Sequence, residues 1–284
     1  MTALREMLAT GVTTVARAWV LSRKDGLMLG FTDHDRPLVV EGVRCRASAG
    51  MSARALETGS GLAVDNSEAA GVLSDDAISE ADLRAGRWDG AEVVVRLVDW
   101  SDPSSTEILF RGSLGEVSYG GGAFQVELRG LTDALNAPRG RVYHSRCDAV
   151  LGDGRCAVDL DAPGRAAEVV ISSASEARVL EVIGAEEAAA GWFVRGRAEL
   201  LDGAAIGLTD RIKIDVPIPG GRRIELWEPL GAAPAIGDRL RIEAGCDKAM
   251  ATCRDKFANL LNFRGFPHIP GDDWLMASPA RRAG

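Results

Sequence analysis

The sequence predicts a mainly β protein with a minor helical content, and three observations support this fold class. Glycine contributes 33 of the 284 residues, about 12% against the ~7% of an average protein. Many of these glycines fall in turn-like places such as 120–122 and 219–221. Between the turns lie short segments in which apolar and polar residues alternate, a pattern typical of strands with one buried face. Segments with helical periodicity are few.

The first of two predicted domains spans residues 1–145 and is expected to be an antiparallel β-barrel or sandwich. Its alternating, strand-like segments are 13–21, 24–31, 92–100, 108–117 and 123–129. The dipeptide Asp25-Gly26 is a strong hairpin signal between the first two. A short helix is expected within 76–86, which contains Ser79-Glu80-Ala-Asp82 and ends in a glycine.

The second predicted domain spans 146–284 and combines a small inserted β domain with a C-terminal cysteine-bearing helical or loop segment. The inserted domain covers about 165–243. Its strand-like segments are 168–183, 191–201, 210–216, 223–227 and 236–242. After it, 248–261 carries apolar residues at helical spacing. This helix would have Cys246 at its start and Cys253 two turns later on the same face.

Four of the five cysteines form two compact pairs, Cys147 with Cys156 and Cys246 with Cys253, on either side of the inserted domain. Such a set favours one shared metal centre, because cysteine sulfur is the ligand that soft metals and iron-sulfur clusters select. The sequence lacks the pattern of a secretory signal, so we expect synthesis in the reducing cytoplasm. Metal ligation is then favoured over two local disulfides. Cys45 alternates like a strand residue and is interpreted as core packing.

The spacing within the pairs leaves two cofactors open. Structural zinc sites usually take cysteines separated by about two to four residues, because one ion holds each sulfur at about 2.3 Å. Here eight and six residues separate the partners, which fits zinc poorly. A [4Fe-4S] cluster has one iron at each of four corners and accommodates wider loops, although common ferredoxin spacings are also tighter than these. We therefore expect a [4Fe-4S] cluster on Cys147, Cys156, Cys246 and Cys253, with zinc as the alternative.

The charge balance and the residue patterns argue against several classes of function. Lys plus Arg total 33 against 41 Asp plus Glu, a formal net charge of −8. A protein that reads nucleic-acid sequence would show a basic patch, whereas a negative surface is compatible with passive passage of DNA. No apolar run approaches the roughly 18 to 20 residues of a membrane-spanning helix. No catalytic constellation is evident, so we do not expect an enzyme.

Several motifs resemble a known family. They are GFTDHDR at 30–36, CDAVLGDGRC at 147–156, AGCDK at 244–248, CRDKF at 253–257 and NFRGFPHIPG at 262–271. The chain resembles the tail-tip or baseplate hub proteins of long-tailed bacteriophages and gene transfer agents, and its C-terminal part is similar to the iron-sulfur tail-tip protein L of phage lambda. The likeness extends over nearly the whole chain, and the cysteine motifs are its most specific part.

This resemblance implies a structural virion protein that forms a ring, expected to be a trimer, below the tail tube and carries a [4Fe-4S] cluster. A distal tail protein would lie above the ring and a larger tip or fibre-bearing protein below it. The protein would be cytoplasmic during assembly and then part of the virion tail tip, where DNA delivery takes place.

The residues alone keep other functions open. One alternative is a cytoplasmic iron-sulfur electron carrier, and another is an interaction module held together by zinc. For the cluster itself, a structural crosslink is the simplest role, because four thiolates fill its iron corners and leave no open position. Redox sensing outside the reducing cytoplasm is the alternative.

Overall fold

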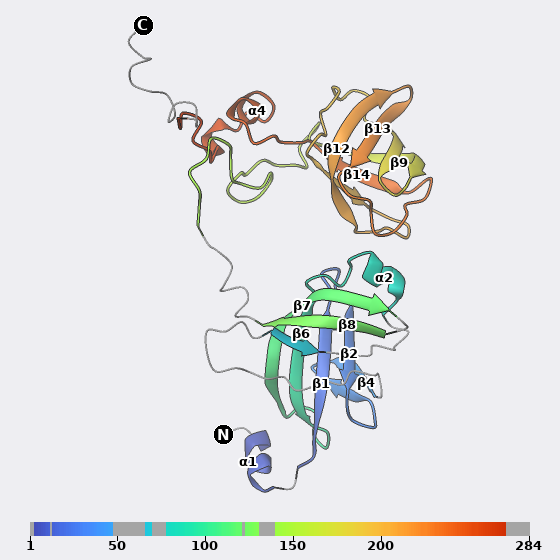
Figure 1. Cartoon of the computed structure of the whole chain (residues 1–284), viewed down its shortest axis with the longest axis vertical. Helices are drawn as coiled ribbons and strands as arrows, with labels where there is room; N and C mark the ends of the chain where they lie inside the picture. The colour runs from blue at the N-terminus through green and yellow to red at the C-terminus, as the bar shows by residue number, and fades with distance from the viewer. Residues whose placement is uncertain are drawn as a thin grey trace. The chain divides into compact units, whose positions relative to one another are not determined.

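We analysed a computed structural model of the chain, which describes residues 3–11, 13–47, 66–69, 78–120, 123–130 and 140–270. The chain divides into two compact units, Met1–Pro138 and Arg139–Gly284 (Figure 1). The sequence had placed the division after residue 145. Residues 271–284, the end of the predicted second domain, lie outside the described ranges, as do Gly121 and Gly122 of the glycine turn.

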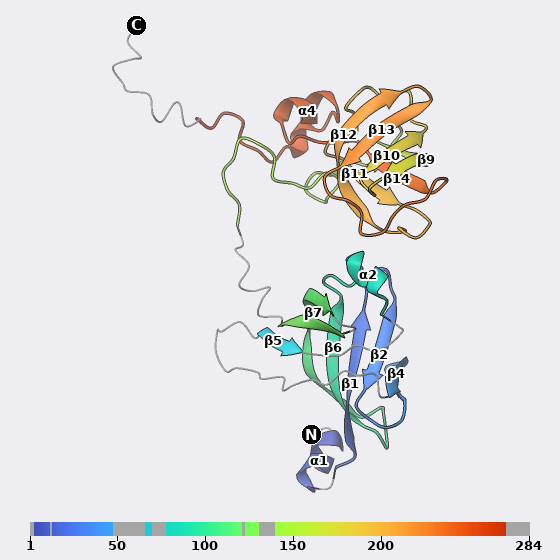
Figure 2. The ribbon, with the colours of Figure 1, turned by 45° about the vertical axis from the view of Figure 1, so that its right-hand side comes forward.

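The first unit is built on one eight-stranded sheet with the strand order β3-β4-β2-β1-β6-β7-β8-β5 (Figure 2). Its strands are β1 (Val15–Ser22), β2 (Met28–Thr32), β3 (Leu38–Val40), β4 (Val43–Ala47), β5 (Asn66–Ala69), β6 (Glu92–Asp99), β7 (Thr106–Gly120) and β8 (Ala123–Gly130). All five predicted strand segments of this half form strands. The mainly β fold class is confirmed.

One strand pair departs from the expected antiparallel arrangement. Strand β4 pairs with β2 in parallel, with Gly30 opposite Cys45. The cause is the hairpin that joins β3 to β4, whose turn residues Glu41 and Gly42 both have positive φ, as tight hairpin turns require. The hairpin adds to the edge of the sheet through β4, so that β4 runs in the direction of β2. A side chain at Gly30 would put its Cβ 2.9 Å from the Cys45 Sγ atom.

Strand β1 is buried on both faces of the sheet. Trp19 and Leu21 contribute to one apolar core, and Ala18 and Val20 contribute to the other. This follows from the alternation of side chains along a strand. Cys45 lies in the second core with no exposed surface, which agrees with its interpretation as a packing residue.

The described part of this unit contains two short helices, α1 (Ala3–Ala9) and α2 (Glu80–Arg84). The second was predicted within 76–86, of which 76 and 77 lie outside the described residues. The Ser79 hydroxyl accepts a hydrogen bond from the Asp82 backbone N–H at 3.1 Å, which satisfies one free donor at the helix start. Gly86, with a φ of +67°, follows the helix end and provides the left-handed conformation typical of a helix stop.

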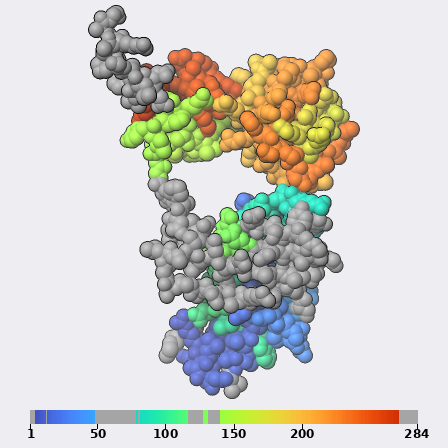
Figure 3. Space-filling model, viewed as in Figure 1, coloured from blue at the N-terminus to red at the C-terminus, as the bar shows by residue number. Residues whose placement is uncertain are grey.

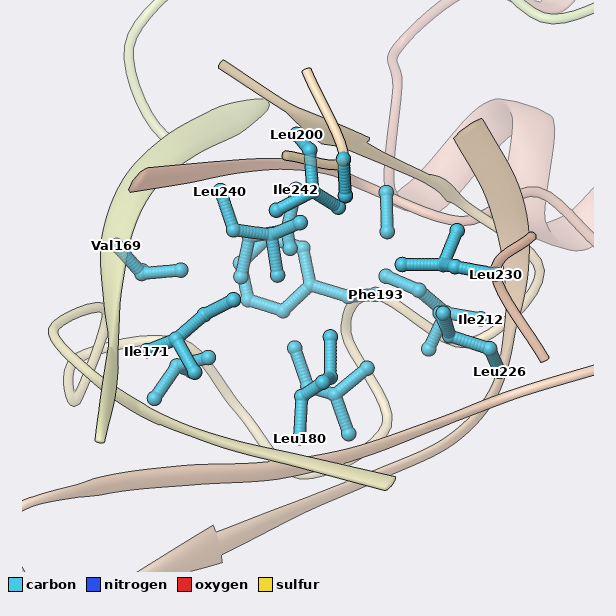
Figure 4. Close-up of a cluster of buried hydrophobic side chains, with 14 residues drawn as sticks. Val169, Ile171, Leu180, Phe193, Leu200, Ile212, Leu226, Leu230, Leu240 and Ile242 are labelled. Atoms are coloured by element: carbon cyan, nitrogen blue, oxygen red, sulfur yellow. The ribbon is translucent and has the colours of Figure 1, made fainter. Parts of the chain in front are cut away.

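The second unit contains a closed six-stranded barrel with the order β10-β13-β12-β11-β14-β9. Its strands are β9 (Ala166–Ser175), β10 (Val179–Ile183), β11 (Arg197–Leu200), β12 (Thr209–Ile218), β13 (Gly221–Leu226) and β14 (Arg239–Glu243). Figure 4 shows the apolar side chains that fill the barrel, with the Phe193 ring among them. Because β14 pairs with β9, the first and last strands of the barrel are neighbours.

A buried ion pair lies in the wall of this barrel. Arg222 and Asp215 have no exposed side-chain surface, and the Arg222 Nε atom donates to the Asp215 Oδ1 atom at 2.7 Å. The same guanidinium donates to the carbonyls of Ala188 and Ala189 at 2.7 and 2.9 Å. Asp215 also accepts the Phe193 backbone N–H at 2.9 Å. Both charged groups of this pair are therefore partnered, and their hydrogen bonds hold the loop before β11 to the barrel.

Replacing Arg222 with Met should destabilise the second unit by about 3–5 kcal/mol, because Asp215 would remain as an unpaired buried charge. Denaturant unfolding monitored by circular dichroism measures this loss. The matched control is Arg239→Met, which removes an exposed pair with Asp202 and should cost much less, because solvent screens such a pair. Equal losses in the two variants would contradict the structural role of the buried pair.

Burial raises the pKa of the Cys45 thiol from its ordinary value of 9 to about 11. Between these pH values the unfolded chain loses the thiol proton while the folded chain keeps it. The free energy of unfolding should therefore fall as the pH rises from 9 to about 11. Unfolding curves for the wild type and Cys45→Ala across this window test this. In the variant the free energy of unfolding should fall less steeply with pH. An unchanged slope would show that Cys45 does not cause this pH dependence.

Candidate metal centre at four cysteines

The four paired cysteines come from three segments of the second unit. Cys147 and Cys156 lie in the loop that precedes β9, and Cys246 lies just after β14. Cys253 is in helix α4 (Met250–Asp255). All four line one small pocket, together with apolar residues such as Phe257. In the space-filling view the light-green loop lies against the red segment that contains α4 (Figure 3).

The geometry that brings the pairs together differs from the predicted one. Instead of one helix over 248–261, the chain forms α4 and a separate 3-10 turn, η1 (Leu260–Asn262). Cys246 precedes the helix, whose N-cap residue is Ala249. Lys248 has a φ of +67°, a left-handed conformation that a helix cannot include. The two cysteine pairs are therefore brought together by the fold of the connecting loops and not by a shared helical face.

Backbone hydrogen bonds hold the two cysteine-bearing segments side by side. The Cys147 backbone N–H donates to the Lys248 carbonyl at 2.9 Å. One Arg146 guanidinium nitrogen donates to the Asp247 carbonyl at 2.9 Å, and the Lys248 ammonium donates to the Ala149 carbonyl. We call residues 140–160 and 245–270 together the cysteine module. Its two halves are about a hundred residues apart in sequence and are joined mainly by hydrogen bonds to backbone carbonyls.

All five cysteines are free thiols. Cys156 and Cys253 are buried, and Cys147 and Cys246 are partly buried. Burial raises the pKa of Cys246 and of Cys253, and the neighbouring sulfurs raise both further. Four thiolates so close together would repel one another in a medium of low polarity. They can ionise together only if a cation or a positively charged cluster core compensates their charge.

Three of the sulfurs accept contacts from N–H groups. The Lys248 backbone N–H points at the Cys246 Sγ atom and the Arg264 backbone N–H at the Cys147 Sγ atom, both at 3.4 Å. The Asn259 amide lies 3.8 Å from the Cys156 Sγ atom. Hydrogen bonds of this kind stabilise thiolates bound to a metal and tune the potential of clusters. The Cys253 thiol donates to the Asn259 carbonyl at 3.2 Å.

The donor set fits a metal-thiolate group in its chemistry, whereas its spacing does not match a single ion. Within the described ranges no group of three or more His, Cys, Asp or Glu side chains could hold one metal ion. The cavity among the cysteines is about 10 Å³, close to the room for one water molecule. Protonated thiols pack like small apolar groups. A cluster between them would require the four sulfurs to move apart.

Asn259 and Lys256 are contacts of this site that sequence reasoning did not find. The Asn259 amide donates to the Cys156 carbonyl at 2.6 Å, and its own oxygen accepts from Asn262 at 2.8 Å. These two bonds fix the orientation of the amide. Nothing in the spacing of Asn259 marks it, because Cys156, its partner at this site, lies about a hundred residues away in the sequence.

The chain thus combines two β units with a pocket of four free thiols among apolar side chains. Residues 1–159 match the family model described as "Baseplate hub protein, N-terminal attachment domain". The chain therefore belongs to this baseplate hub family, and the predicted resemblance is confirmed. Residues 191–273 match a second model, "Phage conserved hypothetical protein BR0599".

A solved structure supports the same relationship over the whole length of the chain. It is described as the virion of a native gene transfer agent particle and contains a chain that is 55% identical to this one, with a TM-score of 0.89. The likeness covers 98% of this chain and 95% of that chain. No curated protein matches. Among the described helices, none is long and apolar enough to span a membrane.

Proposed function

We propose that this protein is a structural component of the tail-tip hub in a particle of the gene transfer agent type. The observation that carries the proposal is the 55% identity, over nearly the full length of both chains, to a chain of a native gene transfer agent virion. The match of the first 159 residues to a hub attachment domain supports the same location. The likeness includes both units, so the proposal does not depend on one domain alone.

Within that particle, the chain would form a ring, a trimer, below the tail tube. A distal tail protein would contact it from above and a larger tip or fibre-bearing protein from below. Its net charge of −8 favours the passage of DNA without binding, because like charges repel phosphates. Assembly would occur in the cytoplasm, and the mature protein would reside in the virion.

The four cysteines would hold a [4Fe-4S] cluster that crosslinks the cysteine module. Cys147 and Cys156 precede β9, Cys246 and Cys253 follow β14, and these two strands are neighbours in the barrel. The cluster would supply four strong iron-thiolate bonds and would leave no open iron for a substrate. Its contribution is therefore stability, because metal binding that requires the folded site is linked to folding. Redox sensitivity is a second property that such a cluster could give.

The protein purified without oxygen should contain about four iron and four sulfide per chain. Cys253→Ser removes one thiolate and should lower both contents and the melting temperature of the second unit. Iron and acid-labile sulfide assays, with an absorption spectrum, measure this. The control is Cys45→Ala, which leaves the cysteine module intact and should keep the wild-type metal content.

Two results would contradict the cluster. Stoichiometric zinc without sulfide would assign the cysteines to zinc instead. A metal-free wild-type protein whose stability is unchanged by Cys253→Ser would remove the crosslink altogether.

Deleting the gene in a producer cell should yield particles or tails without a complete tip, and these should fail to deliver DNA. Electron microscopy and a gene-transfer assay measure the two effects, and the wild-type gene supplied in trans should restore both. Tails of normal appearance with normal transfer would refute the assignment to the hub.

A further inference from the structure

Lys256, the residue directly after α4, points its ammonium group at the barrel. The ammonium donates to the Trp192 carbonyl and, at 2.8 Å, to the Gly245 carbonyl. It also lies 4.2 Å from the centre of the Trp192 ring and 5.5 Å from that of the Phe257 ring. Two carbonyls and two aromatic faces thus surround one cation. Cation-π contacts are strongest where the cation is desolvated, and Lys256 is partly buried.

Trp192 is itself held by the barrel and by the loop before it. The indole N–H donates to the Gly164 carbonyl at 3.0 Å. The preceding carbonyls of Ala188 and Ala189 are bound by the buried Arg222. Lys256 therefore contacts a position that the barrel has already fixed, and not a freely moving loop.

The chain that leads from β14 to Cys246 packs against the same position. The Gly245 backbone N–H donates to the Trp192 carbonyl at 3.0 Å. A Cβ atom at Gly245 would lie only 1.6 Å from the Val194 carbonyl oxygen, so only glycine permits this approach. The Trp192 carbonyl thus accepts from both Gly245 and Lys256, and the start of the cysteine module is joined there to the segment after α4.

The charge of Lys256 also acts on the cysteine pocket. Burial lowers the pKa of Lys256, while Cys246, Asp215 and Asp247 act in the opposite direction by favouring its charged form. Fixed charges interact more strongly in a partly buried site than in water. Because the ammonium binds the carbonyl of Gly245, the residue directly before Cys246, its charge stabilises negative charge on the Cys246 sulfur.

We propose that Lys256 is a positioning residue that fastens the cysteine module to the barrel through Trp192 and Gly245 and offsets negative charge at the cysteines. The fastening is a property of the chain itself. The charge effect rests on the proposed cluster. Removing Lys256 should therefore loosen α4 and the loop around Trp192 together, and should make a bound cluster harder to reduce.

The first test compares Lys256→Met with Lys213→Met by hydrogen exchange in the full-length protein. Lys213 lies over an exposed tryptophan, 5.8 Å from the Trp227 ring centre, on the same barrel. Lys256→Met keeps much of the side-chain volume but removes the charge and its hydrogen bonds. We expect exchange in α4 and in residues 191–196 to rise about tenfold or more, and to stay at the wild-type rate in Lys213→Met. Unchanged exchange in Lys256→Met would overturn the proposal.

The second test measures the midpoint potential of the iron-loaded proteins. Lys256→Met should lower the potential, because an added electron loses a nearby positive charge, whereas Lys256→Arg keeps the charge and should restore most of the wild-type value. Equal potentials in all three proteins would refute the charge effect. If the wild type contains no iron, the proposed cluster fails, and the hydrogen-exchange comparison alone decides whether Lys256 fastens the module. A Lys256→Met protein that does not fold is replaced by Lys256→Gln in both tests.

Discussion

The hydrogen-bond ladder between β14 and β9 is the constraint on which the second unit depends. It pairs Glu243 with Ala166 and Arg239 with Val170, and so closes the barrel. Closure removes the exposed strand edges that an open sheet would leave. It also makes the first and last strands neighbours, so that the chain before one and the chain after the other leave the barrel at the same place. This closure brings the two cysteine-bearing segments to one place, and the contacts between their loops complete the convergence of the two cysteine pairs.

The two units are stabilised in different ways. In the first, β1 is buried on both faces, and the apolar cores on either side include Trp19 and Cys45. The second has one core inside the barrel and a small apolar cluster at the cysteines that contains Ala244 and Phe257. Short loop segments of this kind bury little surface, and small cores usually need a crosslink or a metal. The four thiols lie next to this small cluster.

The sequence was sufficient to predict most of the strands but not how they meet. Alternation and turn residues located most strands of both units, whereas the short strands β3 and β5 were not predicted. The spacing of the cysteines singled out the four that share a pocket. The parallel pairing of β4 with β2 was missed, because it depends on which edge the β3–β4 hairpin joins. The helical placement of Cys246 was wrong, because the left-handed Lys248 is set by long-range contacts. Asn259 and Lys256 were missed for a related reason, since the partner that ties each of them to the rest of the fold, Cys156 or Trp192, is distant in sequence.

Each of the two family matches contains part of the cysteine module. The first ends at residue 159, beyond the division at Pro138, and contains Cys147 and Cys156. The second, 191–273, contains Cys246 and Cys253. Each matched region thus supplies half of the thiols, and neither holds a complete set. Because β9 lies between the two matches and pairs with β14, the barrel is what brings the halves together. The end of the first match and the C-terminal region are therefore joined by the fold of the second unit, and the cysteine module takes two thiols from each matched region.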